Sequence, residues 1–459
     1  MYRKYIDNLE NWLNKENRKP LMVWGARQVG KTYLIKHLFA EKYFKRKYIY
    51  IDCRTDYRFT EYCTSHLNAS DIISYLSLEH NKKIDSSTLL IFDEAQECLP
   101  IITLMKYFCQ EYREIPVIVT GSMVRIKIQR SIRKRGSGTK AEFLFPVGNI
   151  NQLTIYPMTF DEFLLNKNQA LYDTIVSAYQ KKTALEKEVH TLALDAFYEY
   201  LMIGGMPEAV DTYLKTKSRF EAQSVLKDLY DNYLADMELY QASPEAVVRA
   251  KKIFENIYVQ LNKESKNFKC NDIESGARYR DLQNPIDWLT LAFVVEKSSL
   301  IKEHVTTPLL ESPESIFRLY LSDVGMFSYQ SGINATSFIT KDGRNTLSGI
   351  FYENYAANEL SAHGIRLFYW KGKGSAEFEF VVDSNSEIIP IDVKKRRGKM
   401  NSLEKFRIHN SFTYAVKVSA DNFGYDAETQ ILTVPFYMFF LAADDLAKGI
   451  RLTEPRLLP

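Results

Sequence analysis

A glycine-containing octapeptide between an apolar run and a helical pattern constrains this fold more than any other feature. Four apolar residues (21–24) precede it, and apolar residues at helical spacing follow it between residues 34 and 39. The motif G-x-x-x-x-G-K-[ST] is matched by Gly25, Ala26, Arg27, Gln28, Val29, Gly30, Lys31 and Thr32. In a strand-to-helix context, this motif predicts a loop whose backbone N–H groups face phosphate oxygens at a helix N-terminus.

Two side chains of the octapeptide are expected to contact a nucleotide and its metal. The Lys31 ammonium would reach the β- and γ-phosphates, and the Thr32 hydroxyl would bind Mg²⁺. The glycines let the backbone curl around the phosphates, and the helix N-terminus adds a partial positive charge. We therefore predict an ATP site with Mg²⁺ at residues 25–32.

A second motif about sixty residues downstream supports this interpretation. Four apolar residues (89–92) lead into Asp93 and Glu94, which is a Walker B pattern. Asp93 is expected to hold Mg²⁺, and Glu94 is expected to polarise the attacking water as a general base. The next apolar segment ends at Ser122, which we expect to sense the γ-phosphate; a hydrogen-bonded turn without such a role is the alternative.

Four apolar segments alternate with helical patterns in the N-terminal part of the chain. They cover residues 21–24, 47–53, 88–96 and 116–122. The third segment is almost continuously apolar, as expected of a strand covered on both faces. The alternation predicts a parallel α/β sheet with helices on both faces and a ligand site at the carboxyl ends of its strands.

Length and charge limit the remaining possibilities. The 459 residues suggest about two to four domains, and 46% hydrophobic with 25% charged residues excludes a disordered or collagen-like chain. The formal net charge is only +3, so any nucleic-acid surface must be a local patch. One stretch, 123–140, holds no acidic residue and seven basic ones: Arg125, Lys127, Arg130, Arg133, Lys134, Arg135 and Lys140. Arg113 and the arginines of this stretch are candidates for an arginine finger, but no spacing selects one.

Cysteine usage and hydropathy indicate the compartment. The five cysteines are scattered and form no Cys-x-x-Cys pair, which argues against a disulfide framework and a zinc ribbon. The N-terminus is charged and lacks the apolar stretch of a secretory signal. The longest apolar run, 431–443, is shorter than the ~20 residues of a membrane span and is expected to be a buried core segment. We therefore expect a cytoplasmic protein that does not enter a membrane.

The middle of the chain has a helical pattern. Residues 160–260 are expected to be helical, interrupted by Gly204-Gly205 and Pro207, which mark a sharp turn before a helix. Residues 245–310 predict helices followed by a short β-element. That order suits a small winged-helix-like unit.

Three carboxylates and a lysine near the C-terminus form a second candidate site. Glu353 lies in a helical stretch, Glu379 on a predicted strand, and Asp392 and Lys394 on its hairpin partner, with the turn near 383–386. Residues 392 and 394 share one face of their strand. Such a set can hold a divalent metal and an attacking water, as a nuclease requires. Polar faces of a half-buried hairpin explain the spacing equally well.

A basic run follows this hairpin: Lys394, Lys395, Arg396, Arg397 and Lys399. These side chains would suit nucleic-acid phosphates. A solvated loop is the more common explanation of such a run.

Taken in order, these motifs resemble the bacterial and archaeal ATPases that have an AAA-type N-terminal domain and a C-terminal domain of unknown function. The resemblance covers nearly the whole chain and rests on GARQVGKTYLIKHL, LLIFDEAQ, VIVTGS, FPVGNINQLTIYPMTFDEFL, YLMIGGMPEAV, QLNKESKNFKC, GARYRDLQNPIDWL, YLSDVGMF, GIFYENYAANEL and IIPIDVKK. It implies an AAA+/STAND-like P-loop NTPase domain at 1–160, a helical lid with a winged-helix-like region at 161–310, and a restriction-endonuclease-like PD-(D/E)XK domain at 311–459.

The resemblance also implies roles for residues. Lys31 and Thr32 would be the Walker A residues, Asp93 and Glu94 the Walker B pair, and Ser122 the sensor. The nuclease-like set would be Glu353, Glu379, Asp392 and Lys394, with a second divalent metal. This set departs from the usual pattern, because Glu379 stands where Asp is usual and Asp392 where Glu is more common. Glutamate is one methylene longer than aspartate, so the two departures change side-chain length in opposite directions. They either compensate for each other across a metal or mark a site that no longer cleaves its substrate.

Three functions fit the sequence. The first is an ATP-hydrolysing switch or motor that acts through its C-terminal part on a partner such as double-stranded DNA. The second is a metal-dependent DNA nuclease gated by ATP. The third is a nucleotide-dependent regulator that binds DNA or a protein partner without enzymatic action on it. The sequence leaves the oligomeric state open.

Overall fold

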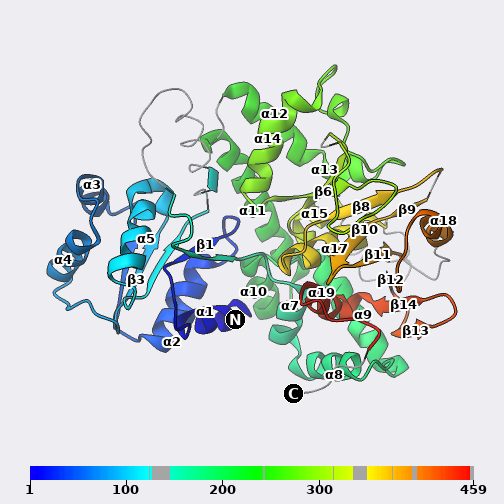
Figure 1. Cartoon of the computed structure of the whole chain (residues 1–459), viewed down its shortest axis with the longest axis horizontal. Helices are drawn as coiled ribbons and strands as arrows, with labels where there is room; N and C mark the ends of the chain where they lie inside the picture. The colour runs from blue at the N-terminus through cyan, green and yellow to red at the C-terminus, as the bar shows by residue number, and fades with distance from the viewer. Residues whose placement is uncertain are drawn as a thin grey trace. The chain divides into compact units, whose positions relative to one another are not determined.

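The computed structural model describes residues 1–122, 125–126, 145–240, 243–313, 315–333, 349–374, 376–394 and 401–454 (Figure 1). The chain divides into two compact units: Arg3–Tyr156, and Met1–Tyr2 together with Pro157–Pro459. Below, they are called the N-terminal unit and the C-terminal unit.

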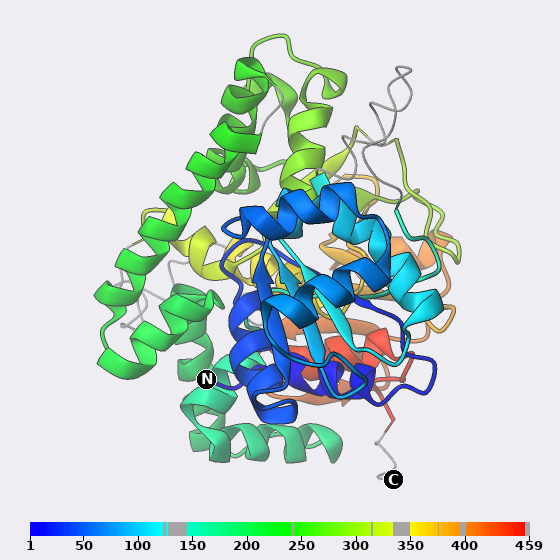
Figure 2. The ribbon, with the colours of Figure 1, turned by 90° about the vertical axis from the view of Figure 1, so that its left-hand side faces the viewer.

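The N-terminal unit alternates strands with helices (Figure 2, blue to cyan). Its elements are α1 (Tyr5–Leu13), β1 (Leu21–Trp24), the π-helical η1 (Tyr33–Ala40), α2 (Glu41–Tyr43), β2 (Tyr48–Asp52), α3 (Tyr57–Ser65), α4 (Ala69–Glu79), β3 (Leu89–Asp93), η2 (Ala95–Glu97), α5 (Leu99–Glu111), β4 (Val117–Thr120) and β5 (Asn151–Thr154). The four strands predicted from the sequence are confirmed.

These strands form one parallel sheet in the order β2-β3-β4-β1-β5. Every residue of β1, β3 and β4 is buried, as the continuous apolar runs predicted for covered strands. The order places β4 between the strand that leads into the glycine motif and the strand that ends in Asp93. The carboxyl ends of all three therefore lie at the same edge of the sheet.

The first half of the C-terminal unit is helical, as the sequence predicted. It contains α7 (Phe160–Lys167), α8 (Gln169–Gln180), α9 (Lys187–Ile203), α10 (Pro207–Thr216), α11 (Arg219–Tyr240), α12 (Pro244–Glu255), α13 (Ile257–Leu261), η3 (Cys270–Asp272) and α14 (Tyr279–Leu291).

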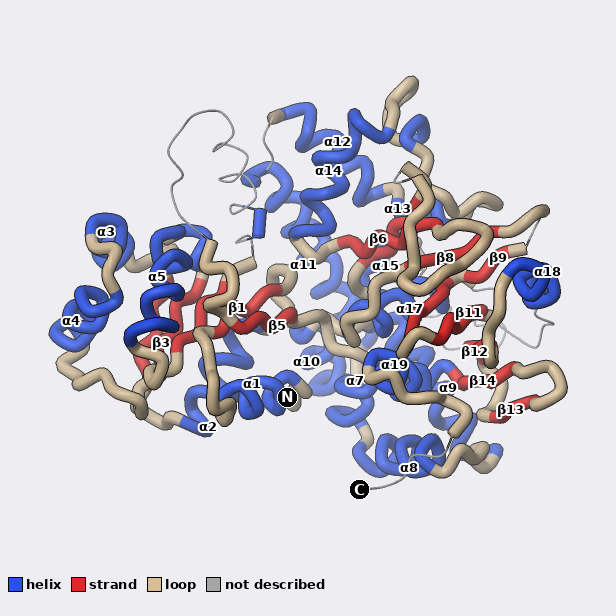
Figure 3. Tube along the Cα trace, in the orientation of Figure 1, coloured by secondary structure: helices blue, strands red, loops and turns tan. Residues whose placement is uncertain are grey.

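The second half contains two mixed sheets (Figure 3, red). One has the order β7-β6-β8-β9, with β6 (Val295–Leu300), β7 (Phe317–Leu321), β8 (Phe368–Lys371) and β9 (Glu377–Phe378). The other has the order β10-β11-β12-β14-β13, with β10 (Phe380–Ser384), β11 (Glu387–Val393), β12 (Ala415–Ser419), β13 (Gly424–Asp426) and β14 (Ile431–Pro435). The helical elements here are α15 (Val324–Gln330), α17 (Ile350–Ala362), α18 (Asn401–His409), η5 (Phe436–Met438) and α19 (Phe439–Ala447).

Strand β6 ties the middle of the chain to its C-terminal part. It pairs antiparallel with β7 and parallel with β8, so a strand from before residue 310 shares a sheet with strands from after it. The winged-helix-like region and the domain boundary at 310 stay predictions. The restriction-endonuclease-like fold is likewise a proposal.

The predicted hairpin at the C-terminal site is confirmed. Strands β10 and β11 pair antiparallel, with Ser384 opposite Glu387. Asn385 and Ser386 between them both have positive φ, 53° and 66°. Two such residues suit a type I′ turn, whose twist matches that of the two strands.

Aromatic side chains fill the core of the C-terminal unit. Phe436 stacks on Phe197 of α9 and on Tyr352 of α17, with ring centroids 4.9 and 4.6 Å apart. The apolar run at 431–443 forms β14, η5 and the start of α19, so its assignment to the core is confirmed. Within the described ranges, no helix has both the length and the apolar character needed to cross a membrane.

Candidate functional sites

The glycine motif in the N-terminal unit needs two of its glycines for different reasons. Gly25 has φ of 141°, and a Cβ there would lie 2.2 Å from the carbonyl oxygen of Ile155. Gly30 has φ of 84°, in the region that disfavours side chains. The helical segment starts directly after Gly30, so the motif is the predicted strand–loop–helix.

A buried arginine outside the motif holds this loop. Arg3 donates from Nη1 to the carbonyl oxygen of Val29 at 2.7 Å and from Nη2 to that of Tyr156 at 2.8 Å. Its side chain is only 2% exposed. Arg3 thereby fixes the loop backbone against the end of β5, a role that the sequence did not reveal.

Lys31 lies in the loop with its ammonium turned inward. Its Nζ donates to the carbonyl oxygens of Gly25 at 3.0 Å and Ala26 at 2.6 Å. Burial lowers the pKa of Lys31 to about 8, against the opposing effect of Glu94 and Asp93. The side chain is therefore mostly charged at neutral pH, as phosphate binding requires.

Asp93, an expected ligand of the metal, accepts hydrogen bonds from two hydroxyl groups. The Thr32 hydroxyl donates to Asp93 Oδ2 at 2.6 Å, and the Tyr50 hydroxyl donates to the same oxygen at 2.9 Å. The backbone N–H of Glu94 donates to Oδ1 at 2.9 Å. Hydroxyl and carboxylate oxygens are the ligands that Mg²⁺ prefers, so this donor set fits the ion.

Glu94 follows in a strained conformation and makes its own contacts. Its φ of 50° is in the left-handed region, which is costly for a residue with a side chain. Its carboxylate pairs with Arg54 Nη2 at 2.9 Å and accepts a short hydrogen bond from Gln96. The side chain keeps 22% exposure, so water can reach it.

This unit also contains the predicted sensor Ser122, the arginine-finger candidate Arg113 and the basic stretch 123–140. Ser122 is buried just beyond β4. Arg113, two residues beyond the end of α5, donates from Nε to the Cys109 carbonyl of that helix. The guanidinium of Arg125 lies 5.6 Å from the Trp24 ring, and burial lowers its pKa. The rest of the basic stretch, Lys127, Arg130, Arg133, Lys134, Arg135 and Lys140, lies outside the described residues, as do Lys395, Arg396, Arg397 and Lys399.

Tyr50 gives a direct test of the metal role of Asp93. Removing its hydroxyl in Tyr50→Phe takes away one donor that orients the carboxylate. Loss of such a supporting contact typically weakens metal binding about tenfold or more. We expect Tyr50→Phe to need about tenfold more Mg²⁺ for half-maximal ATP turnover in a Mg²⁺ titration.

The control for Tyr50→Phe is Tyr48→Phe, which removes a hydroxyl two residues earlier on β2. Tyr48→Phe should keep the wild-type Mg²⁺ requirement. An unchanged requirement in Tyr50→Phe would show that Asp93 does not depend on this contact.

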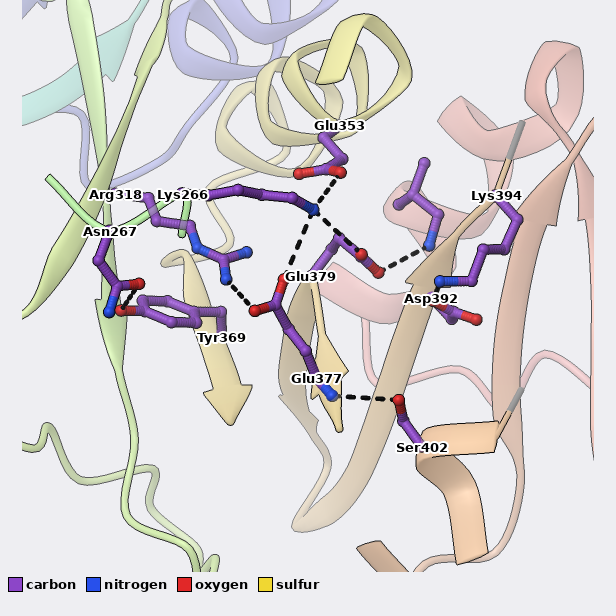
Figure 4. A network of polar contacts seen from close by, with 11 residues as sticks. Lys266, Asn267, Arg318, Glu353, Tyr369, Glu377, Glu379, Asp392, Lys394 and Ser402 are labelled. Carbon is purple, nitrogen blue, oxygen red and sulfur yellow. Dashed lines mark hydrogen bonds and ion pairs between the residues drawn. The ribbon is translucent and has the colours of Figure 1, made fainter. Parts of the chain in front are cut away.

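In the C-terminal unit, the four predicted residues come together around a lysine that was not predicted (Figure 4). Lys266 Nζ lies 2.5 Å from Glu353 Oε1 and 3.4 Å from Glu379 Oε1. Glu379 lies at the bend between β9 and β10, and its Oε2 accepts from the backbone N–H of Val393 at 3.2 Å. Lys394 Nζ lies 2.7 Å from Asp392 Oδ1, as their shared strand face predicted.

A further acidic residue, Glu377, extends this network. Its carboxylate lies 3.5 Å from Lys266 Nζ and 2.7 Å from Nη2 of Arg318. Arg318 is fully buried, and its guanidinium lies 4.0 Å from the Tyr369 ring. Glu377 and Glu379 are two residues apart in the predicted strand 375–382, which was a signal that both would face the same side.

The carboxyl groups of Asp392 and Glu379 differ in how readily they lose a proton. Burial and the neighbouring Glu379 raise the pKa of Asp392 to about 8. Burial alone would raise the pKa of Glu379, but Lys266 and Lys394 lower it to about 2. The pair therefore shares one proton at neutral pH, held on the Asp392 side.

This shared proton makes stability depend on pH. The folded chain keeps the Asp392 proton up to pH about 8, whereas an unfolded Asp releases it near 3.8. Because the folded state binds more protons in this window, Asp392 lowers stability as pH rises from about 4 to about 8. In Asp392→Asn, the amide can replace the protonated carboxyl and cannot ionise. We expect Asp392→Asn to gain in Tm over the wild type progressively between pH 5 and pH 8, measured by thermal unfolding in a buffer series.

Asp383→Asn on the same hairpin is the control for this pH series, because its carboxylate lies in the turn and accepts from the Ser386 N–H. Its difference in Tm from the wild type should not vary with pH. A constant difference for Asp392→Asn would contradict the shared proton.

No set of three or more His, Cys, Asp or Glu side chains in the described part of the chain is arranged to hold a metal ion. The second divalent metal expected from the resemblance is thus not supported by the geometry of this cluster.

Comparison with protein families separates the chain into three segments. Residues 17–164 match an AAA domain, residues 194–337 match a domain of unknown function (DUF8612), and residues 348–437 match another domain of unknown function (DUF4143). The N-terminal unit is therefore similar to AAA-type P-loop domains, and it has the parallel sheet expected of them. A search of curated proteins found no match.

Solved structures give distant likenesses. The Walker-type ATPase PABY2304 of Pyrococcus abyssi is 14% identical, with 72% of this chain and 95% of that chain covered and a TM-score of 0.41. AMPPCP-bound DnaA from Aquifex aeolicus is 14% identical, covers 62% and 86%, and has a TM-score of 0.27. The replication initiator DnaA bound to AMPPCP and single-stranded DNA is 14% identical, covers 62% and 85%, and has a TM-score of 0.28. At such low TM-scores, these likenesses carry no weight for fold or function.

Proposed function

We propose that the chain is an ATP-hydrolysing switch whose N-terminal unit binds Mg-ATP and whose C-terminal unit acts on a partner. The observation that carries this proposal is the contact between the Thr32 hydroxyl and Asp93. It joins the two motifs at one point beside Lys31, and these are the groups that Mg-ATP needs.

Each side chain then has a defined task. The Lys31 ammonium would exchange its loop carbonyls for phosphate oxygens, which are stronger acceptors because they are charged. Thr32 and Asp93 would hold Mg²⁺, which neutralises phosphate charge. Glu94 would accept the proton of a water whose oxygen attacks the γ-phosphorus, while the bond to the bridging oxygen breaks and ADP leaves. Ser122, close to the end of β4, would contact the γ-phosphate.

A measurement of Mg²⁺-dependent ATP hydrolysis by the purified protein, with and without double-stranded DNA, tests this proposal. Hydrolysis that DNA stimulates would support DNA as the partner, and hydrolysis indifferent to DNA would favour a protein partner. Failure to bind ATP would overturn the proposal.

A second candidate is a regulator that binds its partner without cleaving it. Lys266 favours this function over a nuclease, because its ammonium lies among the carboxylates that a catalytic metal would need. Metal-dependent nicking of DNA that is lost in Lys394→Ala would instead favour the nuclease.

A further inference from the structure

Lys266 lies at the centre of the C-terminal carboxylate cluster (Figure 4). Its Nζ is within 2.5, 3.4 and 3.5 Å of carboxylate oxygens of Glu353, Glu379 and Glu377. Glu353 lies on the helix α17, whereas Glu377 and Glu379 lie on β9 and the bend that follows it. An ammonium has three N–H donors, and three acceptors surround this one.

The charges of the network nearly balance without a metal. Four carboxyl groups, those of Glu353, Glu377, Glu379 and Asp392, face three cations. The cations are Lys266, Arg318 and Lys394. Buried carboxylates without such compensation would be strongly unfavourable.

The segment that carries Lys266 is held by contacts on both sides of it. The Phe268 N–H donates to the Phe317 carbonyl at 2.8 Å, and the Lys269 N–H donates to Gln260 Oε1 at 2.7 Å. The Tyr369 hydroxyl donates to Asn267 Oδ1 at 2.8 Å. Lys266 is therefore fixed in the cluster by its neighbours as well as by its charge.

We propose that Lys266 is the built-in cation of this cluster and takes the place that a divalent metal would occupy. A divalent ion bound to oxygens of Glu353 and Glu379 at about 2.0–2.6 Å would stand beside the ammonium, and the two positive charges would repel. Metal and Lys266 therefore exclude each other. Glu353 Oε2, which is buried without a hydrogen-bond partner among the described residues, is the oxygen that becomes a ligand when Lys266 is removed.

The test measures Mn²⁺ binding to the nucleotide-free full chain. The EPR signal of free Mn²⁺ reports how much of the ion stays unbound. An Asp93→Asn background keeps the P-loop from contributing, so the result is independent of ATP hydrolysis. We expect Lys266→Met in this background to bind one Mn²⁺ ion at the cluster, at least about tenfold more tightly than the background protein binds any Mn²⁺ there. Adding Glu353→Gln to Lys266→Met should abolish that binding.

Lys263→Met is the matched control, because Lys263 lies three residues before Lys266 and pairs with Asp272 outside the cluster at 2.8 Å. It should bind no more Mn²⁺ than the background. Equal binding with and without Lys266, or a folded Lys266→Met that gains no binding, would overturn the proposal.

Folding itself gives a second readout if Lys266→Met is unstable. Mn²⁺-dependent folding of Lys266→Met, alongside metal-independent folding of Lys266→Met/Glu353→Gln, would support the proposal. A Lys266→Met chain that stays unfolded with Mn²⁺, while the double variant folds, would overturn it.

Discussion

Glu94→Gln is expected to abolish ATP turnover while leaving ATP bound. Glutamine has the shape of glutamate but cannot accept the proton of the attacking water. Loss of a general base typically lowers the rate about 10²- to 10⁴-fold. Lys31, Thr32 and Asp93, the residues expected to bind the nucleotide, are untouched. The hydrogen bonds of Lys31 to the loop carbonyls and of Thr32 to Asp93 do not involve the Glu94 carboxylate.

The measurement pairs phosphate release with nucleotide binding in the same preparations. Lys31→Ala should lose binding and turnover together, because the ammonium contributes to the bound state itself. Glu97→Gln is the carboxylate control, three residues further on in η2, and should turn over ATP at the wild-type rate. A Glu94→Gln protein with wild-type turnover would place the base elsewhere. A wild-type chain that binds ATP without hydrolysing it would make the chain a nucleotide-gated regulator.

The P-loop unit could be predicted because its signals are local. Each strand is a short apolar run, and the motif places its functional groups within eight consecutive residues. The meeting of Thr32 with Asp93 followed from the rule that parallel strands place their carboxyl ends at one edge. The strand order itself, with β4 between β1 and β3, depends on crossovers that no short motif encodes.

Arg3, Tyr50 and Arg54 were not predicted, because their roles depend on distant contacts. Arg3 reaches Val29, and Tyr50 reaches Asp93 from the neighbouring strand. A single arginine or tyrosine carries no pattern that distinguishes a buried partner from solvent.

The C-terminal site shows the same limit more strongly. Glu353, Glu379, Asp392 and Lys394 were found by strand and helix periodicity, and the structure brings them together. Lys266 lies in the sequence QLNKESKNFKC, which marked the resemblance without suggesting a role. Its position in a charged segment between helices resembles a solvated lysine, and only the folded unit reveals its burial against Glu353.

Gly205→Ala is expected to destabilise the C-terminal unit severely. The Gly204-Gly205 turn, predicted only as a break between helices, is a close contact between backbones. A Cβ on Gly205 would lie 1.9 Å from the carbonyl oxygen of Met158. The same residue accepts from the Met158 N–H at 2.7 Å and donates its own N–H to Asp323 Oδ2 at 2.6 Å.

No rotamer relieves this contact, because the clash is between a Cβ and backbone. The backbone must therefore move, and the buried Asp323 loses one of its N–H donors, that of Gly205. Overpacking costs about 1–3 kcal/mol, and a lost hydrogen bond to a charged group costs about 1.5–3 kcal/mol. The sum is about 2.5–6 kcal/mol, which corresponds to a fall in Tm of roughly 4–10 °C for a unit of about 300 residues.

Calorimetry of Gly205→Ala beside Gly424→Ala separates this cause from the general effect of replacing glycine. Gly424 begins β13, and a Cβ there would meet nothing within 4 Å. Its replacement should change stability by no more than about 0.5 kcal/mol. A wild-type Tm for Gly205→Ala would mean that the backbone around Met158 can move without a loss of stability. In that case, the glycine pair would be a turn without a packing role, and the contact between Asp323 and Gly205 would not hold this junction together.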